Sequence, residues 1–170
     1  MARRRAAVAA LAVVAIAVVA TVAVLVSRRG EDSTRLEVVT LARGEESKYR
    51  LDSVDVSMEV IRTAAEGQDF WSKHDPSGSL GNRPSVNFST SSVVAVLAYG
   101  GYDDGVTVQR VTASGDDGRV RAHVRHTPAA DDCNTLDISL THFHIVRVSP
   151  AVPPSARVEL DVDTDVRNCP

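Results

Sequence analysis

The chain has 170 residues, of which 19 are Lys or Arg and 22 are Asp or Glu. Five of the arginines lie within the first 29 residues, so 14 basic residues remain beyond Arg29 against all 22 acidic ones, a net charge of about −8 for that part. Non-specific nucleic-acid binding needs a basic stripe, which this acidic part does not supply. Nucleic-acid binding is therefore excluded as the expected function.

Residues 1–29 have the pattern of an N-terminal signal anchor. Residues 6–26 are uncharged and almost wholly apolar, with arginines on both flanks. As a helix they would rise about 31 Å, which matches the roughly 30 Å hydrocarbon core of a bilayer. The apolar run is longer than that of a secretory signal, which favours a retained transmembrane helix; cleavage near Thr21-Val22-Ala23, followed by secretion, is the alternative. We predict a single-pass anchor in the cell membrane, a linker over 30–35 and one extracytoplasmic domain over 36–170.

The domain is predicted to begin with two strands and a helix. Residues 36–41 and 54–60 have strand patterns, and the second segment alternates apolar and polar residues. Thr63 and Glu66 then form a T-x-x-E capping box, in which each side chain accepts a hydrogen bond from the backbone of the other residue. A helix is therefore predicted over 64–74.

The predicted helix has a core-facing side and one weakness. Phe70 and Trp71 are expected to turn toward the core, because they are its large apolar side chains. Gly67 is expected to weaken the helix, since glycine loses more backbone entropy than other residues on folding.

Three strand patterns follow, and two of them are predicted to form a hairpin. Residues 93–99 are almost continuously apolar, which is typical of a strand buried on both faces. Residues 106–111 and 120–125 alternate in polarity. Asp116-Asp117-Gly118 lies between them, and Asp-Gly is favoured in tight hairpin turns because such turns need positive φ.

Residues 138–148 and 158–162 are the last predicted strands, and prolines between them forbid a helix or a continuous ladder. Within 138–148, His142 and His144 share the face of the even-numbered apolar residues, while Phe143 occupies the other face. We expect a β-bulge there to turn Phe143 inward. The predicted fold is mainly β, an antiparallel sandwich or barrel-like domain with one short helix.

Cys133 and Cys169 are the only cysteines. An even pair in an exported domain indicates a disulfide, and two free thiols are the alternative. Closing this loop would stabilise the domain by roughly 3 to 4 kcal/mol in the chain-entropy model.

Four histidines form the candidate metal site, His123 and His126 on one predicted strand and His142 and His144 on another. Imidazoles spaced in this way could hold zinc. No cysteine accompanies them, and histidines are common on half-exposed strands, so we predict no metal and no cofactor and keep zinc as the alternative.

Candidates for other chemistry have simpler explanations. Asp161, Asp163 and Asp165 put three carboxylates on one strand face, but the glycine and distal Glu of a calcium loop are missing, and a solvent-facing strand accounts for them. No G-x-S-x-G elbow for a nucleophilic serine occurs in the sequence. We therefore predict a protein that is not an enzyme.

The sequence from residue 70 to 162 resembles the PrcB-like family of exported bacterial domains, whose namesake stabilises a surface protease complex. The residues that carry the resemblance are Trp71, Pro84-Ser85-Val86-Asn87-Phe88, Val93 to Gly100, Gly101-Tyr102 with Gly105, and Thr141 to Val146. Asn87 stands where the family has an acid and His142 where it has a proline, and the glycine-rich turn is shortened or shifted.

This resemblance implies a non-catalytic β domain that binds or steadies an exported protease or another envelope protein. Exposed aromatic and arginine side chains near the glycine-rich turn would bind the partner, and Arg83, Tyr99 and Tyr102 are the candidates. A zinc-dependent enzyme or carrier built on the four histidines, and a passive structural protein of the cell envelope, are the alternative functions.

Overall fold

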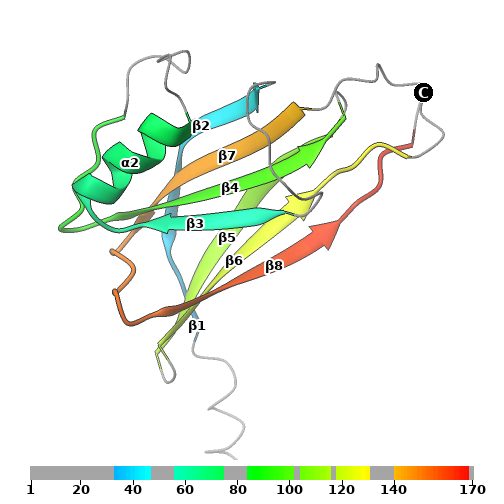
Figure 1. Cartoon of the computed structure of the whole chain (residues 1–170). Helices are drawn as coiled ribbons and strands as arrows, with labels where there is room; N and C mark the ends of the chain where they lie inside the picture. Colours follow the sequence, from blue (N-terminus) through cyan, green and yellow to red (C-terminus); the bar gives the residue numbers. More distant parts are fainter. Residues whose placement is uncertain are drawn as a thin grey trace, which may run out of the picture. The chain divides into compact units, whose positions relative to one another are not determined.

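The computed structural model describes residues 33–46, 56–74, 84–101, 104–115, 118–130 and 140–168 (Figure 1). The chain divides into two compact units, and the second, residues 34–170, contains the β domain. The predicted anchor at residues 6–26 lies outside the described residues. No helix within the described ranges is long and apolar enough to cross a membrane.

The described domain is mainly β, as predicted, and consists of two four-stranded sheets and the helix α2 (Figure 1). One sheet has the strand order β1-β5-β6-β8 and the other β2-β7-β4-β3. The elements in chain order are β1 (Ser33–Arg35), β2 (Glu37–Glu46), β3 (Ser57–Ile61), α2 (Ala64–His74), β4 (Ser92–Gly100), β5 (Val106–Ser114), β6 (Arg119–His126), β7 (Leu140–Ser149) and β8 (Arg157–Thr164).

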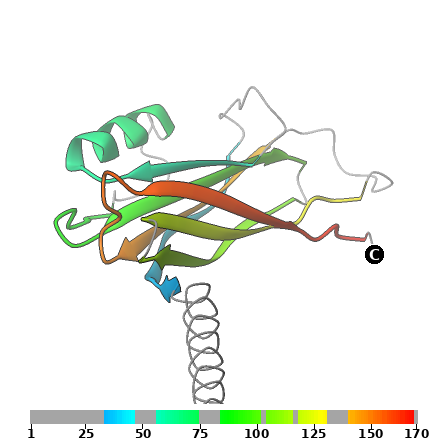
Figure 2. The same ribbon diagram turned by 90° about the horizontal axis from the view of Figure 1, so that it is seen from below.

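The two sheets enclose a core made largely of valine. On β6 the inward residues Val120, Ala122 and Val124 are buried, while alternate residues face outward. The central strands β4 and β7 are buried on both faces, because the second sheet covers one face and α2 packs on the other (Figure 2). This double covering explains why residues 93–99 read as a continuous apolar run.

The predicted helix and its capping box are confirmed. The Glu66 N–H donates to Thr63 Oγ1 (3.1 Å), and the Thr63 N–H donates to Glu66 Oε2 (3.2 Å). Phe70 and Trp71 are buried, as expected from the helical pattern. The boundaries of α2, Ala64–His74, also agree with the predicted range.

β5 and β6 form the predicted antiparallel hairpin, with Ala113 opposite Val120. Gly118 has a φ of 63°, a left-handed conformation that glycine adopts without the steric cost of a Cβ atom. Asp116 and Asp117 of the predicted turn lie outside the described residues.

One pairing differs from the antiparallel prediction. β8 pairs with β6 in parallel, with Val162 opposite Val124. The chain leaves β6 for β7 in the other sheet and returns to the first sheet only at β8, so both strands run in the same direction. Such crossings between sheets are not encoded in local sequence patterns, which is why the prediction was wrong here.

The predicted bulge is also misplaced. β7 pairs with β4 without a register shift from Leu140 to Val148. The irregularity lies in the neighbouring strand β2, between Thr40 and Ala42. Because both faces of β7 are covered, Phe143 can pack on the α2 side while His144 points toward the second sheet, and β7 needs no bulge.

The two lateral sides of the sandwich are built differently. Only Leu36 separates β1 from β2; its side chain is buried, and its N–H donates to the Val111 carbonyl (2.9 Å). The chain thus crosses from one sheet to the other and closes this side. On the opposite side the sheets end in the edge strands β3 and β8, whose inward residues Met58 and Leu160 are only partly buried.

Candidate functional site

An apolar pocket of about 190 Å³ opens between α2 and the sheet β2-β7-β4-β3. Its walls come from β2, the end of β3, α2, the segment 84–88 and the start of β4. The lining residues are Leu41, Ile61, Ala64, Gly67, Gln68, Trp71, Pro84, Val86, Phe88 and Val93. We call this site the α2 pocket.

Gly67 is a packing position as well as a helix residue. A Cβ atom added there would lie 3.2 Å from Phe88 Cζ, closer than an ordinary van der Waals contact. Gly67 is also buried, so the missing side chain lets the Phe88 ring lie directly against the helix. The expectation that Gly67 is only a weakness of the helix therefore has to be corrected. A residue without a side chain is needed at this position because the Phe88 ring approaches the helix closely there.

A turn at Asn87 holds Phe88 in this position. The Asn87 side-chain oxygen accepts hydrogen bonds from the Ser89 N–H (3.1 Å) and the Ser89 hydroxyl (2.7 Å). The Asn87 carbonyl accepts from the N–H groups of Thr90 (3.1 Å) and Ser91 (3.0 Å). Asparagine suits such a turn because its side chain can bond to backbone two residues further on.

None of the described residues that line the pocket has an ionisable side chain, and Gln68 contributes a side-chain amide. At the C-terminal end of α2, the His74 ring lies against Phe70, with ring centroids 4.6 Å apart. His74 Nε2 and Lys73 Nζ lie 3.3 Å and 3.1 Å from Glu59 Oε1. Burial lowers the pKa of His74, and the Glu59 carboxylate opposes that shift. The pocket itself can bind apolar groups but offers no acid, base or nucleophile.

Of the residues predicted to bind a partner, Tyr99 lies within the described part of the chain, and it does not line this pocket. Arg83 and Tyr102 lie outside the described residues. Tyr99 is half-buried near the end of β4, opposite Thr141 of β7. It lies six residues along β4 from Val93, which lines the pocket. At about 3.3 Å per residue, roughly 20 Å separates the two positions.

The four histidines are not brought into one site. His123 points outward from β6, where its Nδ1 lies 2.7 Å from Asp161 Oδ2. His142 donates from Nε2 to the Gly101 carbonyl (2.7 Å). Burial lowers the pKa of His126, and the Asp104 carboxylate opposes that shift. Within the described ranges no group of three or more His, Cys, Asp or Glu side chains could hold a metal ion.

His144 serves as a structural link between the sheets. The backbone N–H of Val108 on β5 donates to His144 Nδ1 (2.8 Å), so the ring proton sits on Nε2 and is donated to Thr40 Oγ1 (2.9 Å). Burial, followed by the positive charge of Arg43, lowers the pKa of His144 to about 4. A neutral imidazole is required here, because a protonated Nδ1 could not accept the Val108 bond.

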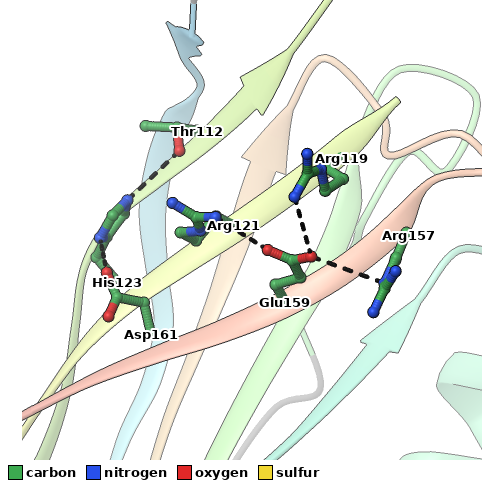
Figure 3. A network of polar contacts seen from close by, with 7 residues as sticks. All are labelled: Thr112, Arg119, Arg121, His123, Arg157, Glu159 and Asp161. Atoms are coloured by element: carbon green, nitrogen blue, oxygen red, sulfur yellow. Dashed lines mark hydrogen bonds and ion pairs between the residues drawn. The ribbon is translucent and has the colours of Figure 1, made fainter. Parts of the chain in front are cut away.

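The outer face of β6 and β8 carries a network of ion pairs (Figure 3). Arg121 Nη2 donates to Glu159 Oε2 (3.0 Å), and the guanidinium groups of Arg119 and Arg157 each lie 3.7 Å from Glu159 Oε1. The hydrogen bond from Arg121 is the largest cause that lowers the pKa of Glu159. The parallel register places Arg121 beside Glu159 and His123 beside Asp161, so basic residue types on β6 face carboxylates on β8.

The three aspartates predicted to lie on a solvent-facing strand are exposed. Asp161 and Asp163 are in β8, and Asp165 follows it. Cys133 and Cys169 lie outside the described residues, so the disulfide stays a prediction.

No family model, curated protein or solved structure matches the chain. The resemblance to PrcB-like domains therefore stays a prediction.

Sequence reasoning named Trp71 and the segment 84–88 for the resemblance but did not predict that they line one pocket. The signal that could have found the site was a glycine inside a well-capped helix, because such a glycine often marks a close approach by another side chain.

Proposed function

We propose that the protein is a membrane-anchored extracytoplasmic module that binds another exported protein and catalyses no reaction. In this proposal the α2 pocket receives an apolar side chain of the partner. An exported protease or another envelope protein is the class of partner that the family resemblance implies.

The observation that carries the proposal is the chemical character of the α2 pocket. It is open and apolar, and aromatic rings from Trp71 and Phe88 form part of its wall. Binding energy at protein interfaces concentrates where one partner inserts an anchor side chain into such a pocket, with polar groups at the rim. Gln68 can supply a rim hydrogen bond. The described lining residues include no ionisable side chain, which disfavours acid–base or nucleophilic catalysis by them.

The segments that carry the family resemblance also contribute residues to the α2 pocket. Trp71 and three residues of the segment 84–88 line the pocket. Trp71, Val86 and Phe88 also belong to the apolar cluster around α2, so these side chains pack in the core as well as line the pocket.

Two sequence features support the extracytoplasmic location, namely the apolar run at residues 6–26 and the cysteine pair. Described residues close in sequence to the two cysteines are joined, because the Ala130 N–H donates to the Arg167 carbonyl (3.1 Å). Cys133 is three residues beyond Ala130 and Cys169 two beyond Arg167, which is compatible with a disulfide. Mass spectrometry of the exported chain tests this; free thiols at both cysteines would contradict the oxidised assignment.

Site-specific photocrosslinking in the native membrane tests the binding surface. A photoreactive residue at Gln68 should give an adduct with one exported protein, identified by mass spectrometry. The same residue at Asp69, which is exposed and does not line the pocket, is the matched control. Ala64→Leu, which extends a lining side chain into the pocket, should abolish the Gln68 adduct. Equal adducts at both positions, or an adduct insensitive to Ala64→Leu, would refute the proposed surface.

A further inference from the structure

A second surface, separate from the α2 pocket, lies along the free edge of β8. β8 is the last strand of the sheet β1-β5-β6-β8 and pairs with β6 on one side only (Figure 1). Within the described part of the chain, no strand pairs with its other side. An edge strand of eight residues exposes a row of backbone donors and acceptors.

The hydrogen bonds beyond β8 show which backbone groups face this edge. The N–H groups of Asp165 and Arg167 donate to the carbonyls of His126 and Pro128, each at 2.9 Å, so odd-numbered residues point toward β6. Backbone groups alternate in direction along a strand. The N–H and carbonyl groups of Leu160, Val162 and Thr164 therefore point to the free edge.

The side chains along this edge alternate between apolar residues that face inward and acidic residues that face outward. Val162 pairs in register with the buried Val124 and so faces inward, yet the residue is 38% exposed. Leu160 also faces inward and is only partly buried, as is Met58 on the edge strand β3. On the outer face, Asp163 is exposed.

The carboxylates along the strand are not equally satisfied. Glu159 already has three arginines within 4.0 Å and Asp161 is paired with His123. By contrast, neither Asp163 nor Asp165 makes an ion pair with a residue that the structure describes. Asp163 lies opposite Arg125 of β6 in the register, but no ion pair within 4.0 Å joins them, and Asp165 follows the end of β8. A cation from outside the domain could therefore still pair with these two carboxylates.

We propose that the free edge of β8 binds an extended segment of a partner protein by strand addition, and that this segment alternates apolar and cationic side chains. Its backbone would pair with the edge groups of Leu160, Val162 and Thr164. Its apolar side chains would cover the partly exposed inward residues of β8, and its cations would lie beside Asp163 and Asp165.

The charge pattern selects this partner over a second copy of the chain. Antiparallel pairing of two β8 strands would place the carboxylates of one copy beside those of the other. Like charges directly opposite each other destabilise strand pairing, whereas opposite charges stabilise it. A basic segment gains from the same carboxylates that repel another β8.

Peptide binding to the full chain in detergent micelles tests the proposal. The probe is a short, fluorescently labelled peptide that alternates Val and Lys, and the comparison peptide has the same composition with its valines and lysines in separate blocks. We expect the alternating peptide to bind at least about tenfold more tightly, because only it can match the edge and both faces. Equal binding of the two peptides would overturn the proposal, since it would show non-specific attraction to an acidic domain.

Val162→Pro separates strand addition from other modes of binding. It removes an edge N–H that makes no bond to β6, and proline is tolerated on the free side of an edge strand. We expect about a tenfold weaker affinity for the alternating peptide, the effect of losing one hydrogen-bonded position. Val162→Thr keeps the N–H and a β-branched side chain, and should bind like the unmodified chain. Unchanged binding by a folded Val162→Pro variant would overturn the proposal.

A charge-reversal variant keeps the test informative if Val162→Pro does not fold. Asp163→Lys with Asp165→Lys changes two exposed side chains and should reverse the preference, from the Val-Lys peptide to a Val-Glu peptide. An unchanged preference would contradict the proposal.

Light scattering that found a dimer, converted to a monomer by Val162→Pro, would contradict the proposal in favour of self-pairing. Ala64→Leu in the α2 pocket should leave peptide binding unchanged, so a failure here is distinguishable from a failure of the proposed function.

Discussion

The two faces of the sheet β2-β7-β4-β3 are made by the same strands, yet one is filled and the other leaves a pocket. On the face toward the second sheet, Val146 and Val148 are fully buried, and the polar side chains have defined partners, such as Ser92 Oγ, which accepts from the Val152 N–H (2.9 Å). On the other face, a helix of 11 residues covers only part of the strands. The difference follows from the covering element, since a sheet can match another sheet along its length whereas a short helix cannot.

The largest effect is expected from His144 on the filled face. Its pKa falls from 6.5 to about 4 in the folded domain, so between these values the unfolded chain binds more protons than the folded one. Stability is therefore present above pH 6.5 and is lost as the pH falls toward 4, by about 3 kcal/mol for this residue. Urea unfolding followed by the fluorescence of Trp71, the single tryptophan, measures this dependence.

His144→Asn is the matched control for this prediction. An asparagine side-chain oxygen can accept the Val108 N–H as Nδ1 does, but it does not titrate. The variant should lose much less stability than the unmodified chain between pH 6.5 and 4. Some dependence should remain, because burial also lowers the pKa of His74 and of His126. An identical pH dependence in both proteins would show that His144 is not the responsible group.

A larger side chain should destabilise the domain on the filled face and have little effect on stability in the pocket. Ala122 is fully buried in the core between the sheets, where Ala122→Leu should lower the free energy of unfolding by about 1 to 3 kcal/mol through overpacking. Ala64 lines the α2 pocket and is exposed, so Ala64→Leu should change stability by less than about 0.5 kcal/mol. Urea unfolding of both variants at neutral pH makes the comparison, and equal losses would show that the pocket is as tightly packed as the core.

The cap of α2 is expected to contribute less. Thr63→Ala removes the hydroxyl that accepts the Glu66 N–H and should cost about 1 kcal/mol. Thr63→Ser keeps an acceptor at this position and should retain most of the stability. If both substitutions had the same effect in urea unfolding, the capping bond would not contribute to the stability of α2.

The smallest effect is expected on the outer face of the other sheet, which is exposed to solvent. Glu159→Gln removes the carboxylate that Arg121 holds, and the stability of the unmodified chain should fall slightly as the pH drops through the lowered pKa of Glu159. The difference in stability between the Glu159→Gln variant and the unmodified chain should be smaller at high salt than at low salt, because exposed ion pairs are screened. Thermal unfolding at low and high salt measures it, and a loss that salt does not reduce would contradict the assignment.

The elements that depend on local sequence were predictable. Thr63 and Glu66 predicted α2 because a capping box is a short-range pattern, and the apolar run of β4 predicted a strand covered on both faces. The same patterns do not contain the order of strands in a sheet. The parallel pairing of β6 with β8 depends on crossings through the other sheet, and for this reason it was missed.

The candidate site was predictable only in its components. The helical pattern predicted that Trp71 is buried, but it could not explain Gly67, because Phe88, which packs against Gly67, is distant in the sequence. The histidines likewise show that local spacing does not determine which side chains meet in the fold. Their spacing allowed a zinc site, but spacing does not determine that His123 faces outward while His144 bonds to β5.

The single residue between β1 and β2 has a mechanical consequence. A tensile force applied to the chain before β1 reaches β5 through β1, and it reaches β7 through Leu36 and β2. Both layers of the sandwich would therefore carry the load together, and neither could be peeled away by itself from this end. When the chain is pulled from its N-terminus, Leu36 is therefore the residue at which the force divides between the two sheets.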